Sequence, residues 1–109
     1  MTKIEERFWQ YHQANPGIYN LFVHYALEAQ ASGHAKYSVW ALANRVRWHV
    51  DIEVNDPNTA FKISNDYLAY YARLIMLEQP ALADFFDTKP MQTEPSFVAV
   101  NATPAMAVI

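Results

Sequence analysis

The sequence predicts a mainly α fold with a minor β part: four to five helices, with one β-hairpin between the third helix and the fourth. Apolar residues recur at helical spacing in four segments, and each segment is preceded by a residue that caps helices well. Residues 45–54, RVRWHVDIEV, alternate strictly between polar and apolar side chains, which is typical of a half-buried strand. The chain has 109 residues, 52% of them hydrophobic, so it can bury one modest core.

The first helix is predicted over about residues 3–14. Thr2 and Glu5 form the T-x-x-E pattern of a capping box, in which the hydroxyl and the carboxylate each accept a hydrogen bond from a free amide at a helix start. Asn15-Pro16 ends this helix and opens the next, because asparagine caps helices well and proline loses no hydrogen bond at the first helical position.

The second helix is predicted over about residues 16–32. Gly33 suits the left-handed position that ends many helices. The apolar residues follow the i, i+3, i+4, i+7 spacing of a stripe that faces a core. They are Ile18, Leu21, Phe22, Tyr25, Ala26 and Ala29.

The third helix is predicted over about residues 38–47, with Ser38 as its cap, and two interpretations compete after it. A continued helix would keep Val50 on the buried stripe but would leave Trp48 and Ile52 on other sides. A strand would put all the apolar side chains of this stretch on one face. The β-branched residues and the strict alternation favour the strand.

A β-hairpin is therefore predicted, with residues 47–54 paired to residues 60–64. The connecting stretch, NDPNTA, is rich in turn-forming residues, and AFKIS resumes the alternation. A further helix follows over about residues 66–79. Pro80 ends it and opens a short fifth helix with the sequence ALADFF.

The predicted domain organisation is one helical domain with its hairpin over residues 1–89 and an extended tail over residues 90–109. Three prolines interrupt the tail, which has one charged residue, Glu94, and no helical period. Its apolar strings, FVAV and AMAVI, leave two interpretations open. Either the tail is incidental and frays, or it packs on the domain or on another chain.

Composition and charge exclude several classes of protein. A net charge of −3 argues against a protein dominated by phosphate binding, and the absence of cysteine excludes disulfides and thiolate metal sites. No apolar run approaches the roughly 20 residues that span a bilayer. The first ten residues, MTKIEERFWQ, carry charges where a signal peptide needs an apolar run. We expect a cytoplasmic protein with no membrane partner and no small-molecule cofactor.

Several short strings occur together within about residues 4–88: Asn15-Pro16, Leu21-Phe22-Val23, Arg47-Trp48, Phe61-Lys62-Ile63-Ser64-Asn65, Tyr71-Ala72-Arg73 and Phe85-Phe86. With these strings the chain resembles a group of short proteins encoded in bacteriophage and prophage genomes. The resemblance leaves the tail out. It implies a phage or prophage setting in the bacterial cytoplasm, and it implies no catalytic residue, because the group has no assigned activity.

The predicted order of elements, three helices followed by a hairpin, is that of a winged helix-turn-helix. Such a domain places a recognition helix in the major groove of DNA and touches the DNA backbone with its hairpin. The mostly apolar third helix and the acidic hairpin tip, NDPN, argue against this interpretation, because phosphates repel acids. The candidate nucleic-acid-binding residues are the cations of this region: Lys36, Arg45, Arg47 and Lys62.

His49, Asp51 and Glu53 would share one face of the predicted strand, which makes a metal-dependent nuclease a remote alternative. Alternate residues on a strand lie roughly 6.6 Å apart, so three in a line cannot hold one cation through bonds of about 2.1 Å. Lys62 would lie across the hairpin, but the acid that nucleases usually place two residues earlier is Ala60 here. A solvated strand face is favoured, and no catalytic or metal-binding residue is assigned.

The aromatic residues are too numerous for all of them to lie at the centre of so small a core. Tryptophan, tyrosine and arginine are the residue types that anchor protein interfaces. Ordinary ring packing is the alternative, and Arg73 could equally pair inside the domain. The sequence thus predicts a non-enzymatic accessory protein that binds a protein partner or a second copy of itself, with DNA as the alternative. The candidate interface residues are Trp9, Trp48, Tyr70 and Arg73.

Overall fold

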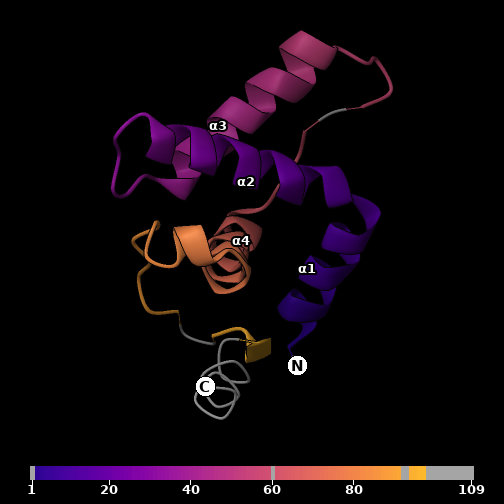
Figure 1. Ribbon diagram of the computed structural model, residues 1–109. Coiled ribbons are helices and arrows are strands. Elements are labelled where there is room, and N and C mark those ends of the chain that lie inside the picture. Colours follow the sequence, from indigo (N-terminus) through magenta and orange to yellow (C-terminus); the bar gives the residue numbers. More distant parts are fainter. Residues whose placement is uncertain (1, 60, 92–93, 98–109) are drawn as a thin grey trace.

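Helices make up the regular structure of the computed structural model, which describes residues 2–59, 61–91 and 94–97 (Figure 1). Within these ranges there are four α-helices and no strand. The α-helices are α1 (Lys3–Ala14), α2 (Pro16–Ala31), α3 (Val39–Trp48) and α4 (Asn65–Glu78). Two short elements accompany them: the π-helix η1 (His49–Val54) and the 3₁₀-helix η2 (Pro80–Leu82).

Helix α4 lies at the centre of the fold, and it contacts α1, α3 and η2 (Figure 1). Its residues from Tyr70 to Ile75 are all buried, and all of them except Arg73 are apolar or aromatic, as expected for a central helix. The ring of Phe8, from α1, meets Tyr71 edge-on with a centroid separation of 4.9 Å. Phe22, from α2, stacks on the same tyrosine. Ring packing between α1, α2 and α4 therefore forms much of the core.

Several of the predicted helix ends are confirmed. Thr2 accepts a hydrogen bond from the amide of Glu5, and Ser38 and Ser64 cap α3 and α4 in the same way. Gly33 has a φ of 104°, in the left-handed region that ends α2. Glu5 does not complete the predicted capping box. Its carboxylate accepts hydrogen bonds from Ser96 instead.

The predicted β-hairpin is wrong. Residues 49–54 continue the axis of α3 as a π-helix, and residues 61–64 are an irregular segment that leads into α4. Val50 is the one residue of η1 that is buried, whereas Trp48 and Ile52 are exposed. This is the outcome expected of a continued helix. An isolated two-stranded hairpin is also marginal in water, because it has no further strand to bury its apolar face.

Asn55 ends this helical run. It has φ 51° and ψ 45°, the left-handed conformation, and its amide donates to the carbonyl of Val50 with an N–O distance of 3.1 Å. Asparagine tolerates this conformation better than other residues with a Cβ atom. The turn after it is fixed by Asp56, whose carboxylate accepts from the amide of Asn58 and the hydroxyl of Thr59. The turn predicted from NDPNTA is therefore present at the expected position. It joins a helix to an irregular segment and not two strands.

The predicted fifth helix is reduced to the single 3₁₀ turn η2, although Phe85 and Phe86 after it are buried. No helix in the described part of the chain has the length and apolar character needed to cross a membrane.

Residues 94–97, the described end of the predicted tail, are attached to the helices at two points. Arg73 donates to Glu94 from Nε at 2.6 Å and from Nη2 at 3.2 Å. Glu5, which is 2% exposed, accepts from the amide of Ser96 at 2.7 Å and from its hydroxyl. Phe97 packs edge-on against Trp9. The AMAVI string and the last three residues of FVAV lie outside the described residues.

Candidate interaction surface

Helix α3 and η1 form an arm, residues 39–54, whose far end projects beyond the other helices (Figure 1). Four large apolar side chains on this arm are exposed: Trp40 by 49%, Trp48 by 57%, Ile52 by 56% and Val54 by 55%. Single exposed apolar residues are common on protein surfaces, but two half-exposed tryptophans on one helix are not ordinary surface composition.

Three of these side chains follow the spacing that places residues on one side of a helix. Trp40, Asn44 and Trp48 are separated by four residues each, and Ile52 continues the series into η1. We call Trp40, Asn44, Trp48 and Ile52 the arm face. Arg47 flanks it, with its guanidinium carbon 5.3 Å from the ring centroid of Phe61. The face and its flank thus combine aromatic, aliphatic and cationic groups, and tryptophan and arginine are among the side chains that anchor protein interfaces.

The arm is held in place by a cluster of Tyr25, Arg45, His49 and Glu53. The Arg45 guanidinium carbon lies 4.4 Å from the ring centroid of Tyr25 on α2. Glu53 accepts from Arg45 at 3.2 and 3.4 Å, and its Oε1 lies 2.8 Å from His49 Nδ1. Hydrogen bonds from His49 and Arg45 hold the pKa of Glu53 below its ordinary value. The cluster joins η1 to α3 and joins α3 to α2.

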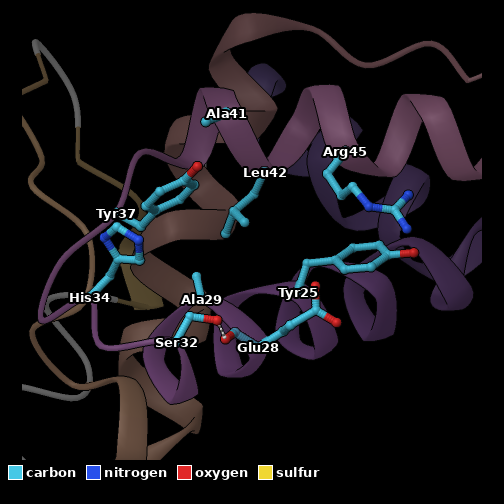
Figure 2. Close-up of a pocket in the computed structure, with 9 residues that line it drawn as sticks. All are labelled: Tyr25, Glu28, Ala29, Ser32, His34, Tyr37, Ala41, Leu42 and Arg45. Carbon is cyan, nitrogen blue, oxygen red and sulfur yellow. Dashed lines mark hydrogen bonds between the residues drawn. The ribbon is translucent and has the colours of Figure 1, made fainter.

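A pocket of about 240 Å³ lies between α2 and α3, next to this cluster. Figure 2 shows Tyr37 and His34 at one end and Tyr25 with Arg45 at the other. The remaining lining residues are Glu28, Ala29, Ser32, Ala41 and Leu42. The pocket is therefore apolar at its base and polar at its rim.

A second, larger cleft of about 580 Å³ separates the start of α3 from α4 and from residues 87–91. Trp40, the first member of the arm face, lines it together with Ala69 and Ala72 of α4. Arg73 also borders this cleft, but its guanidinium is already bound by Glu94. The described wall of the cleft is mostly apolar, and it is continuous with the arm face at Trp40.

The four candidate nucleic-acid-binding cations do not converge on one open surface. Lys36 lies 3.0 Å from Asp87, and Arg45 is bound by Glu53. Arg47 lies over Phe61. Lys62 is exposed, with its backbone carbonyl accepting a hydrogen bond from Tyr11. With the hairpin absent from the described chain, the geometric basis for a winged helix is lost.

The four candidate interface residues differ in how far they are exposed to solvent. Trp48 lies on the arm face, and Trp9 is half-buried, with its Nε1 directed at Glu5 at 3.5 Å. Tyr70 is 2% exposed and packs edge-on against Phe8. Arg73 is 8% exposed and its guanidinium also donates to the carbonyl of Ala69. Tyr70 and Arg73 therefore stabilise the interior in this structure.

His49, Asp51 and Glu53 do not share one face. His49 and Glu53 are neighbours one helical turn apart, whereas Asp51 accepts a hydrogen bond from the amide of Phe61 at 3.5 Å. No group of three side chains suited to a metal ion occurs among the described residues.

Sequence reasoning missed Trp40, Ile52 and Val54 as surface residues, although the continued-helix alternative placed Ile52 off the buried stripe. Comparison of the chain with protein-family models, with curated proteins and with solved structures gave no match.

Proposed function

We propose that this protein is a non-enzymatic accessory protein that binds a protein partner through the arm face. The observation that carries the proposal is that Trp40 and Trp48 lie on the same side of α3 and that each is about half exposed. The third tryptophan, Trp9, instead packs against the rings of Phe8 and Phe97. The phage or prophage setting, which the sequence resemblance implies, belongs to the proposal.

The energy available from covering the arm face supports a protein partner. A tryptophan side chain buries about 150–250 Å² when fully covered, so covering the exposed half removes on the order of 100 Å² from water. At about 25 cal/mol per Å², each exposed tryptophan would contribute about 2.5 kcal/mol to association. Such contributions are those of interface hot spots, and Ile52 would extend the same contact.

DNA binding is the weaker candidate, because ion pairs already balance two of the four predicted cations. Lys36 is paired with Asp87 and Arg45 with Glu53, which leaves Arg47 and Lys62 of the four. Two phosphate contacts would give a small dependence of affinity on salt, with a slope of about −2 in log affinity against log salt. Fluorescence anisotropy with a random duplex, over a series of salt concentrations, tests this candidate separately.

Site-specific photo-cross-linking in bacterial cells tests the proposal. A photoreactive phenylalanine analogue replaces Trp48 in one variant and Leu27 in the control. Leu27 is a suitable control because it is 41% exposed but lies on α2, outside the arm. The proposal predicts a discrete protein adduct from position 48, competed by excess unlabelled protein and absent at position 27. Equal adducts at both positions, or none at either, would contradict it.

A further inference from the structure

The pocket between α2 and α3 has an electrostatic character that the arm face does not. Glu28 is the one carboxylate among the residues that line this pocket. None of the ion pairs within the described residues involves it. Figure 2 shows the Glu28 side chain extending along the pocket towards Tyr25. A carboxylate beside an apolar base is a complement for a cationic group on an aliphatic stem.

Arg45 at the rim interacts electrostatically with Glu28, but it is shared with a second carboxylate. Its guanidinium is already engaged by both carboxylate oxygens of Glu53, at 3.2 and 3.4 Å. The formal charges of Arg45, Glu53 and Glu28 sum to −1. An anionic ligand would have to draw Arg45 away from Glu53 and would still meet the carboxylate of Glu28.

We propose that this pocket receives a lysine side chain of the protein partner, an inference that rests on the function proposed above. The ammonium group binds the Glu28 carboxylate at the rim. The methylene groups lie on Ala29, Ala41 and Leu42, which form the apolar base. A face of the Tyr25 ring is already taken by Arg45, so the Glu28 carboxylate supplies the attraction for the cation.

The position of the pocket fits a partner that also contacts the arm. Arg45 and Trp48 are three residues apart on α3, so their side chains are neighbours on the helix surface. A segment that covers Trp48 would thus pass the rim of the pocket. The apolar contact at Trp48 would supply affinity, and the pairing of the ammonium with Glu28 would supply specificity.

The probe for the test is n-butylammonium, which is the lysine side chain cut at its α-carbon. It is titrated through the millimolar range into the full-length protein, and the amide resonances are followed by ¹⁵N–¹H NMR. Butyrate and n-butanol are the control ligands of reversed and zero charge. Glu28→Gln removes the charge at constant size, and Ala41→Leu fills the base of the pocket. Glu6→Gln removes an exposed charge on α1 as the matched control variant.

The proposal predicts saturable shifts confined to the pocket residues with n-butylammonium, and none with butyrate. Glu28→Gln should weaken binding by roughly tenfold or more, as for loss of one charged hydrogen bond. Ala41→Leu should abolish binding, and Glu6→Gln should leave it unchanged. Stronger binding of butyrate, equal binding by Glu28→Gln, or no saturable shift would overturn the lysine pocket. The cross-link at position 48 is read independently, so failure of the pocket and failure of the arm face are distinguishable.

Discussion

Arg45 and Glu53 are eight residues apart in the sequence, yet their side chains form a two-point ion pair, Nη1–Oε1 at 3.2 Å and Nη2–Oε2 at 3.4 Å. The pair spans the junction between α3 and η1, and His49 contacts the same carboxylate. The far end of the arm depends on this junction, because Val50 is the one residue of η1 that is buried in the core.

Glu53→Gln should therefore loosen η1 while leaving the helical core intact. The expected result in hydrogen exchange is faster exchange of the amides of residues 50–55, with unchanged protection in α4. High salt should reproduce part of the effect in the wild-type protein, because the pair is exposed to solvent. Glu6→Gln, on α1, is the control. Unchanged exchange in Glu53→Gln would show that the ion pair does not hold the arm.

Substitutions of Asn55 by alanine and by glycine should differ clearly in their effect on stability, because the φ of 51° lies in the left-handed region. Asn55→Ala should lower the free energy of unfolding by about 1–2 kcal/mol, the cost of this conformation for a residue with an ordinary side chain. Asn55→Gly should be neutral or nearly so, since glycine adopts positive φ without steric cost. Urea denaturation followed by circular dichroism measures both. A larger loss with glycine than with alanine would contradict the helical end described here.

Phe8 and Trp48 should respond in opposite ways to truncation. Phe8 is fully buried among the rings of α4, so Phe8→Ala should cost about 3–5 kcal/mol of unfolding free energy. Trp48→Ala should change it by about 0.5 kcal/mol or less, as for surface positions without special contacts. Urea denaturation compares the two. A loss of several kcal/mol for Trp48→Ala would place that side chain in the core.

The attachment of residues 94–97 should depend on pH through Glu5 and Glu94. Burial opposes ionisation of Glu5, but hydrogen bonds from Ser96 and Trp9 outweigh it, so its pKa lies below the ordinary 4.5. The hydrogen bonds from Arg73 lower the pKa of Glu94 in the same direction. Because both pKa values are lowered by folding, the stabilisation is complete above pH 4.5 and is lost as the pH falls through the lowered values.

Glu94→Gln tests this dependence. The variant should be less stable than the wild type at neutral pH, and the difference should shrink as the solution is acidified below pH 4.5. Thermal denaturation over a series of pH values measures the difference. A gap between variant and wild type that grows on acidification would have the wrong sign and would refute the attachment by ionised carboxylates.

The four α-helices could be predicted from local signals, because caps and apolar spacing are properties of neighbouring residues. The hairpin could not be excluded locally. Arg45, His49 and Glu53 are four residues apart, and this spacing places side chains on one face of a helix and also on one face of a strand. The contact between Arg45 and Tyr25, which is distant in sequence, cannot be found from such a local pattern.

The candidate site was predicted only in part for the same reason. Trp48 was identified by its residue type, but its exposure follows from the helical course of the arm. The apolar residues around Tyr70 occupy every side of α4, a pattern that already indicates a central helix with little free surface. The partner of Arg73 could not be found from spacing, because Glu94 lies 21 residues away on an irregular segment.

Acrylamide quenching of single-tryptophan variants tests the central claim, that the arm is a continuous helical element presenting its tryptophans to solvent. One variant keeps Trp48 and the other keeps Trp9, with phenylalanine at the remaining tryptophan positions. A free arm face predicts red-shifted emission and strong quenching for Trp48, and weaker quenching for the half-buried Trp9. Protection of Trp48 equal to that of Trp9 in the monomeric protein would show that there is no free arm face.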